Sequence, residues 1–137
     1  MKKLSFTVIV LVALLALSAA TTLYAQSAGT WFKVPFPFTV SGNAMPAGQY
    51  YVEGLWGNAV AIHHSKGEVG LVLLANQTGR APDTKPRLVF HRYGDRYFLA
   101  EVQLPNMDSG GAFYVGKDEQ EIAKAQNRVA NAEIAGR

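Results

Sequence analysis

A large apolar residue at every second position between Trp31 and Val40 is the feature that most limits how this chain can fold. A period of two places alternate side chains on one face of a strand, so the segment predicts a β-strand with a single apolar face. Pro35 and Pro37 lie on the other face, and because proline has no N–H to donate, we expect an edge strand or one with broken pairing. The apolar positions are Phe32, Val34, Phe36, Phe38 and Val40.

Six further segments have the composition and spacing of strands. Residues 69–75 are apolar on both faces, which predicts a central strand. Residues 87–92 and 96–104 flank Tyr93-Gly94-Asp95, which predicts a β-hairpin with the glycine at a positive φ. The predicted strands are 49–55, 59–63, 69–75, 87–92, 96–104 and 112–115. Six or seven short strands joined mostly by turns predict an all-β domain over residues 26–116, a small antiparallel β-barrel or sandwich.

A change of composition at Lys117 predicts a different structure for the end of the chain. Residues 117–137 are rich in Glu, Lys, Gln, Arg and Ala and contain no proline, which favours a C-terminal helix. Asp118 and Glu121 have the spacing of a capping box. Because its apolar residues are few, we expect the helix to lie loosely on the sheet or to project into solvent, with Gly136 and Arg137 fraying.

The first 25 residues have the organisation of a secretory signal peptide. Lys2 and Lys3 form a basic start, residues 4–20 are almost wholly apolar, and small residues precede the expected cleavage site after Ala25. The mature chain would begin at Gln26, and its location would be secreted or periplasmic. The alternative is an uncleaved membrane anchor, against which the polar residues after position 20 argue. After residue 25, the predicted strands do not alternate with long helices. This order excludes a parallel sheet of the nucleotide-binding type.

Charge and cysteine content exclude several classes of function. The whole chain has 13 basic and 10 acidic residues, and without Lys2 and Lys3 the balance becomes 11 against 10, so no basic patch for nucleic acid is expected. The chain contains no cysteine, which excludes disulfides, thiolate metal sites and cysteine nucleophiles. Removal of 25 residues from 137 leaves 112, enough for one compact domain with its own core.

Catalytic and metal-binding patterns are weak. His63 and His64 are adjacent, and neighbouring side chains of a strand point to opposite faces, so the two cannot chelate one ion together. His91 could join one of them only if its strand lay alongside. The serines lack the Gly-x-Ser-x-Gly pattern of a nucleophile elbow, and no pair of acids stands out. We therefore expect no enzyme activity, no cofactor and no metal site.

Aromatic residues near strand ends and turns offer a better indication of function. Rigid amphipathic rings make good contact surfaces, so they could line a carbohydrate-binding or peptide-binding face, or enclose an apolar ligand between sheets. The alternative is that they simply fill a core with few aliphatic residues. These residues are Tyr50, Tyr51, Trp56, Tyr93 and Tyr97.

Three segments together resemble a group of small exported proteins of unknown function that occurs in multiple copies in acidobacterial genomes. They are Val34-Pro35-Phe36-Pro37-Phe38, Met45-Pro46-Ala47-Gly48-Gln49-Tyr50, and the run from Lys85 to Leu99 that contains Phe90-His91-Arg92-Tyr93-Gly94-Asp95. The chain departs from that group at Met45, where leucine is usual, and at Pro37, where a polar residue is expected. The resemblance implies secretion and an all-β fold, and it carries no activity, ligand or site residues.

The sequence thus predicts an exported non-catalytic binding or structural module whose partner is a protein, a glycan or a small apolar ligand. A possible contact site is the end of the hairpin formed by His91, Arg92, Tyr93 and Asp95. The alternative is a structural role, in which Arg92 or Arg96 forms an ion pair with Asp95 that stiffens the turn. The alternative function is a carrier that holds a small apolar ligand inside a barrel. Its inward residues would be Phe36, Phe38, Val52, Leu73, Phe90 and Phe98.

Overall fold

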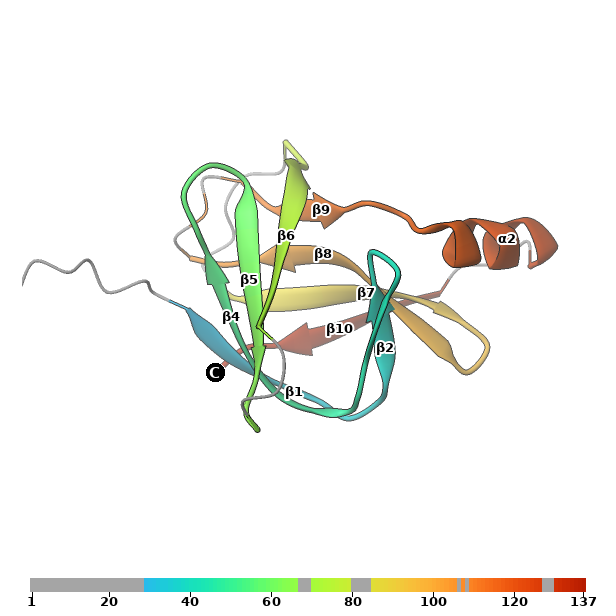
Figure 1. Cartoon of the computed structure of the whole chain (residues 1–137), viewed down its shortest axis with the longest axis horizontal. Helices are drawn as coiled ribbons and strands as arrows, with labels where there is room; N and C mark the ends of the chain where they lie inside the picture. The colour runs from blue at the N-terminus through green and yellow to red at the C-terminus, as the bar shows by residue number, and fades with distance from the viewer. Residues whose placement is uncertain (1–28, 67–69, 80–84, 106, 108, 127–129) are drawn as a thin grey trace, which may run out of the picture.

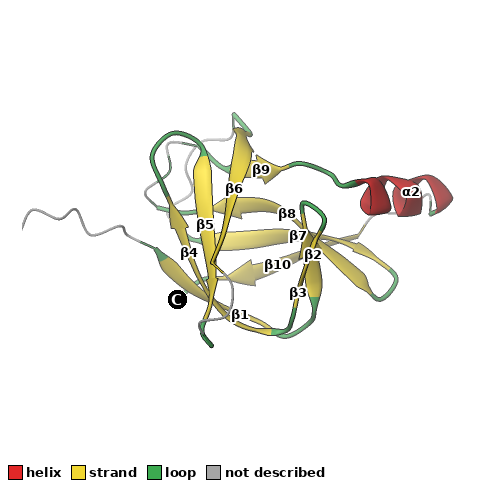
Figure 2. Cartoon of the chain, in the orientation of Figure 1, coloured by secondary structure: helices red, strands yellow, loops and turns green. Residues whose placement is uncertain are grey.

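A computed structural model of the chain describes residues 29–66, 70–79, 85–105, 107, 109–126 and 130–137. The expected signal peptide and its cleavage site lie outside these ranges. The described part is mostly β-structure with one short helix, as Figures 1 and 2 show. The elements are β1 (Thr30–Val34), β2 (Phe38–Val40), β3 (Asn43–Met45), β4 (Gly48–Gly54), β5 (Ala59–His64), β6 (Gly70–Gln77), β7 (Arg87–Tyr93), β8 (Arg96–Gln103), β9 (Gly111–Phe113), α2 (Lys117–Ala125) and β10 (Ala130–Ala135).

The strands form one strongly bent ten-stranded sheet that is not closed on itself. Antiparallel pairing runs from β1 through β4, β5, β6, β9 and β8 to β7 and finally β10. The short β2–β3 hairpin joins β8 through a single parallel pair, Thr39 with Phe98. The two ends of this path approach each other, because the N–H of Arg137 donates to the carbonyl of Trp31 at 3.1 Å.

The predicted strand over residues 31–40 is two strands. β1 ends at Val34 and β2 begins at Phe38, and each pairs with a different neighbour. Pro35 and Pro37 explain the break, because neither can donate to a ladder and each restricts the residue before it. The alternation itself is confirmed, since four of the five apolar side chains are buried. Phe36, in the break, is half-buried and stacks on Tyr97 with ring centroids 3.7 Å apart.

The prediction of a helix over residues 117–137 is wrong for residues 130–135, which form a strand. Helix α2 has nine residues, begins after Gly116 without a side-chain cap, and is followed by strand β10. β10 pairs with β7 in a register that joins Ala130 with Arg92 and Ala135 with Arg87. The unpaired edge of β7 outweighs the weak helix preference of an Ala-rich segment. Gly136 does not fray either, since its N–H donates to the carbonyl of Pro86 at 2.9 Å.

Side chains fill the interior of the bent sheet. Phe90 is fully buried and lies edge-on to Phe36 and Phe38, with centroids 5.1 and 5.3 Å apart. A bulge after Val89 keeps consecutive residues 88–90 buried. The inward-facing phenylalanines therefore contact one another. The core cluster comprises Phe32, Val34, Phe38, Val40, Met45, Tyr50, Val52, Val60, Ile62, Ala75, Leu88, Phe90, Leu99, Val102, Leu104 and Phe113.

Strand β6 lies inside the strand order, between β5 and β9, as its apolar sequence predicts. Its outer face, however, is open to solvent. Val72 is 59% exposed and Leu74 is 71% exposed. They lie opposite Ala61 and Ala59 of β5, whose methyl groups give the outer face little cover. The sheet thus presents an aliphatic surface rather than a second buried layer.

Candidate functional site

The predicted contact site at the β7–β8 hairpin separates into two faces. His91 and Tyr93 lie on one face of β7, and Arg92 lies on the other. Arg92 is exposed, donates from Nε to the carbonyl of Gly94 at 2.9 Å, and places its guanidinium 5.5 Å from the centre of the Tyr97 ring. Asp95 is exposed in the turn. Within the described ranges its carboxylate pairs with neither Arg92 nor Arg96, so the stiffening ion pair is not formed.

A buried carboxylate from helix α2 joins His91 and Tyr93. Glu119 is 5% exposed, one of its oxygens lies 2.8 Å from Nδ1 of His91, and the hydroxyl of Tyr93 donates to the same oxygen at 3.3 Å. It is the buried residue of an otherwise largely exposed helix. Figure 1 shows α2 beyond the end of the sheet, connected to it by the segment that follows β9. A polar contact therefore fixes how the helix lies against β7.

Burial of this cluster alters the acidity of Tyr93. Its pKa is raised above the ordinary value of 10.0, first by desolvation, then by the charge of Glu119 and by the hydrogen bond to that carboxylate. Tyr93 also lies edge-on to Phe98, which packs it from the β8 side. Glu119 was absent from the sequence-based prediction. The sequence does contain a signal for its burial. Glu119 stands three positions before Ile122, a spacing that places the two side chains on the same face of a helix with few apolar residues.

The adjacent histidines point to opposite faces of β5, as predicted. His63 is on the outer face, where Nε2 lies 3.3 Å from a carboxylate oxygen of Glu53 on β4. His64 faces inward beside Tyr50. His91 lies at the distant β7–β8 hairpin, and no group of three metal-ligating side chains occurs in the described part of the chain. The three histidines thus have separate surroundings.

A cavity of about 400 Å³ lies beside His64, between β3 and the β5–β6 end of the sheet. Its lining is mainly aliphatic, with Lys66 at the rim. Nε2 of His64 is buried without a hydrogen-bond partner among the described residues, while Nδ1 accepts from the N–H of Lys66 at 3.3 Å. The lining residues are Asn43, Ala44, Met45, Pro46, Ala47, His64, Lys66 and Leu71.

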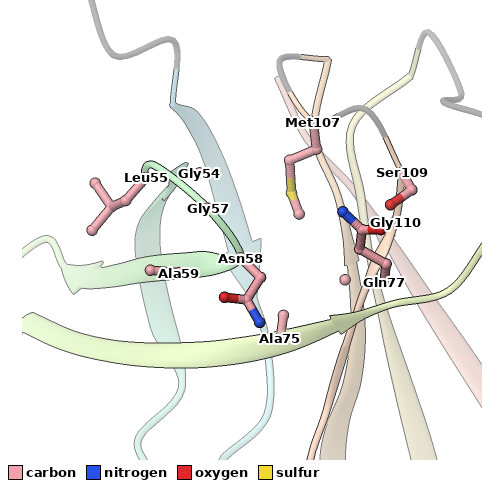
Figure 3. Close-up of a pocket in the computed structure, with 11 residues that line it drawn as sticks. Gly54, Leu55, Gly57, Asn58, Ala59, Ala75, Gln77, Met107, Ser109 and Gly110 are labelled. Carbon is pink, nitrogen blue, oxygen red and sulfur yellow. The ribbon is translucent and has the colours of Figure 1, made fainter.

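A second cleft, of about 230 Å³, lies between the β4–β5 turn, the end of β6, Met107 and residues 109–111 (Figure 3). Among the described residues that line it, the polar side chains are two amides and one hydroxyl, and none is ionisable. They are Gly54, Leu55, Gly57, Asn58, Ala59, Ala75, Gln77, Met107, Ser109, Gly110 and Gly111. Trp56, between two of these residues in the β4–β5 turn, is 89% exposed.

Comparison with known proteins identifies no relative. No protein family, no curated protein and no solved structure matches the chain. Among the described residues, no helix combines the length and apolar character needed to cross a bilayer.

Proposed function

We propose that this protein is a non-catalytic binding module that acts in the periplasm or outside the cell. The observation that carries the proposal is the contrast between a core filled by side chains and large apolar residues left on the surface. Scattered single exposed residues are ordinary, whereas neighbouring ones on a rigid sheet are typical of a contact surface. The exposed residues are Trp31, Trp56, Val72, Leu74, Tyr114 and Val115.

The outer face of β5 and β6 is the clearest such surface. Val72 and Leu74 are both more than half exposed, and a strand held on both sides presents them in a fixed arrangement. At the hairpin, Arg92 and Asp95 supply exposed charges beside the turn, while the bonds of His91 and Tyr93 to Glu119 hold that end of β7. We retain these four hairpin residues as a second contact region.

The same proposal includes export and closure of the fold. Removal of residues 1–25 would leave a chain that begins at Gln26, four residues before β1. The strand path from β1 to β10 is that of a small barrel left open between its ends, which the Arg137–Trp31 hydrogen bond brings together. Such an arrangement would protect the edges of β1 and β10 from pairing with other chains.

A carrier of a small apolar ligand is the second candidate. The cavity beside His64 favours it, because Met45 and Leu71 give it an apolar wall of a size that suits a small ligand. The predicted ligand site among the inward phenylalanines is less suitable, because those rings contact one another. A carrier would therefore use the end of the sheet rather than its centre.

Native mass spectrometry of the protein recovered from its exporting host tests both candidates. We expect the mass of residues 26–137 plus a bound partner that is lost on denaturation. The double variant Val72→Lys/Leu74→Lys should lose a partner held by the outer face, and Ala44→Lys, at an exposed residue that lines the cavity, should lose a ligand held there. Ala125→Lys/Gln126→Lys, which adds the same two charges at exposed positions away from both surfaces, is the matched control. A wild-type chain that carries nothing would contradict the proposal.

A further inference from the structure

The cleft in Figure 3 is held in shape by backbone hydrogen bonds. On one side, the carbonyl of Asn58 accepts from the N–H of Ala75 at 2.8 Å, which fastens the β4–β5 turn to β6. On the other, the carbonyl of Gly110 accepts from the N–H of Thr78 at 2.9 Å and from its hydroxyl at 3.2 Å. Both walls are thus attached to the same strand. A cleft fixed in this way needs little reorganisation to receive a ligand.

The polar groups of the cleft are free to bind a ligand. The side-chain amides of Asn58 and Gln77 and the hydroxyl of Ser109 form no hydrogen bond with other described residues. Each amide offers donors and an acceptor, and a hydroxyl can serve as either. Figure 3 shows the Met107 side chain directed into the space between Asn58 and Gln77, which adds an apolar contact.

Trp56 lies on the turn that forms one wall. At 89% exposed, its indole has almost no contact with the protein, although burial of a ring this size would be favourable. Leu55 before it and Gly57 after it both line the cleft. An exposed indole on a well-held turn can lie flat against a ligand that extends out of the cleft.

We propose that this cleft binds one ring of a neutral glycan, with Trp56 stacking on the adjoining ring. Sugar hydroxyls both donate and accept hydrogen bonds, which matches the amides of Asn58 and Gln77. The C–H faces of a pyranose match Met107 and the indole. A volume of about 230 Å³ is below the range of about 300 Å³ and more that is usual for drug-sized ligands, and it suits a single ring.

This inference specifies the partner class of the proposed binding module and rests on that function. It places the ligand away from the β5–β6 outer face and from the hairpin. None of the lining residues that the structure describes is ionisable, so these side chains offer a charged ligand no ion pair. A bound peptide strand needs separate pockets for its alternate side chains, whereas a cleft of about 230 Å³ suits a single ring.

Tryptophan fluorescence provides the first test. The chain has two tryptophans, so in the Trp31→Phe variant all tryptophan fluorescence comes from Trp56. Titration with cellotetraose, maltotetraose and chitotetraose should shift its emission to shorter wavelength for at least one sugar, because the ring leaves water. Calorimetric titration of the wild-type chain with the same sugars should give the same affinity as the Trp31→Phe variant.

Variants then locate the site. Trp56→Ala should weaken binding about tenfold or more, and Asn58→Ala or Gln77→Ala should weaken it about threefold to tenfold each. Gln49→Ala is the control, because it shortens an exposed side chain of β4 outside the cleft and should change neither affinity nor melting temperature. Trp56 has few contacts to lose, so its variant should melt at the wild-type temperature.

Failure of this inference is distinguishable from failure of the proposed function. No binding of any of the three sugars at millimolar concentration, or binding that Trp56→Ala leaves unchanged, would overturn the glycan site. If the protein from its host nevertheless carries a non-glycan partner, the binding module stands and only the cleft assignment falls. If it carries no partner and binds none of the sugars, both are refuted.

Discussion

Replacing Glu119 by alanine should release helix α2 from the β7–β8 hairpin without unfolding the sheet. The carboxylate is the buried group of that helix, and its partners are Nδ1 of His91 at 2.8 Å and the Tyr93 hydroxyl at 3.3 Å. Alanine removes the acceptor and leaves the Tyr93 hydroxyl in a site where that residue is only 5% exposed. An unpaired buried donor is costly, so the substitution should destabilise the native state.

The expected loss is about 2 kcal/mol in the free energy of unfolding. A hydrogen bond to a charged group contributes about 1.5 to 3 kcal/mol and an ordinary one about 1 kcal/mol. Both bonds end on the Glu119 carboxylate and so belong to the first class. The His91 side chain is 33% exposed and can regain water, and the Tyr93 bond is long at 3.3 Å, so the two together contribute about 2 kcal/mol. Glu119→Gln keeps the shape and an acceptor for Tyr93, so it should cost about 1 kcal/mol.

Urea unfolding and hydrogen exchange together measure this effect. Midpoint and slope give the free energy, while amide exchange should accelerate in residues 117–125 and remain slow in β7 and β8. Glu121→Ala, an exposed glutamate on the same helix, controls for the change in helix preference. A loss below about 0.5 kcal/mol for Glu119→Ala, or equal losses for the two variants, would refute the view that this carboxylate holds the helix.

Three further perturbations follow from the same structure. Burial and Glu119 raise the pKa of Tyr93, so its contribution to stability is complete below pH 10.0 and is lost as pH rises through the folded-state value. Tyr93→Phe should therefore reduce the alkaline loss of stability measured by urea unfolding, and an unchanged loss would contradict this assignment. A Cβ on Gly48 would lie 2.5 Å from Nε2 of His64, so Gly48→Ala should cost about 1 to 3 kcal/mol, and adding His64→Ala should recover part of it. Deleting residues 130–137 uncovers the β7 edge and should cause aggregation on size-exclusion chromatography, whereas a monomer of unchanged stability would contradict the role given to β10.

Local patterns predicted most of the strands, because alternation and turn residues act within a few positions. The hairpin between β7 and β8 is an example, since Gly94 has the positive φ of 60° that the turn requires. The break at Pro35 and Pro37 has a local cause as well. Prolines on the solvent face predict an edge strand or broken pairing, and both apply: β1 stands at the end of the strand order, and the pairing breaks between β1 and β2.

Strand β10 and the Glu119 cluster could not be predicted in the same way, because each depends on contacts between distant parts of the chain. Residues 130–135 have an Ala-rich composition that suits a helix, and their strand conformation comes from pairing with β7, about 40 residues earlier. Glu119 is separated from His91 by 28 residues. Its burial follows from the position of α2, which the sequence of the helix does not specify.

The two polar sites lie at opposite ends of a filled core, and this arrangement has a consequence for function. Figure 1 shows the β4–β5 turn at one end of the sheet and α2 beyond the other. Both walls of the cleft are tied to β6, and the core between the sites is packed with side chains. Coupling between sites needs an element with two arrangements, and each element described here has one. Occupation of the cleft should therefore leave amide exchange in α2 unchanged, so that the module can bind at one end while the helix keeps its orientation at the other.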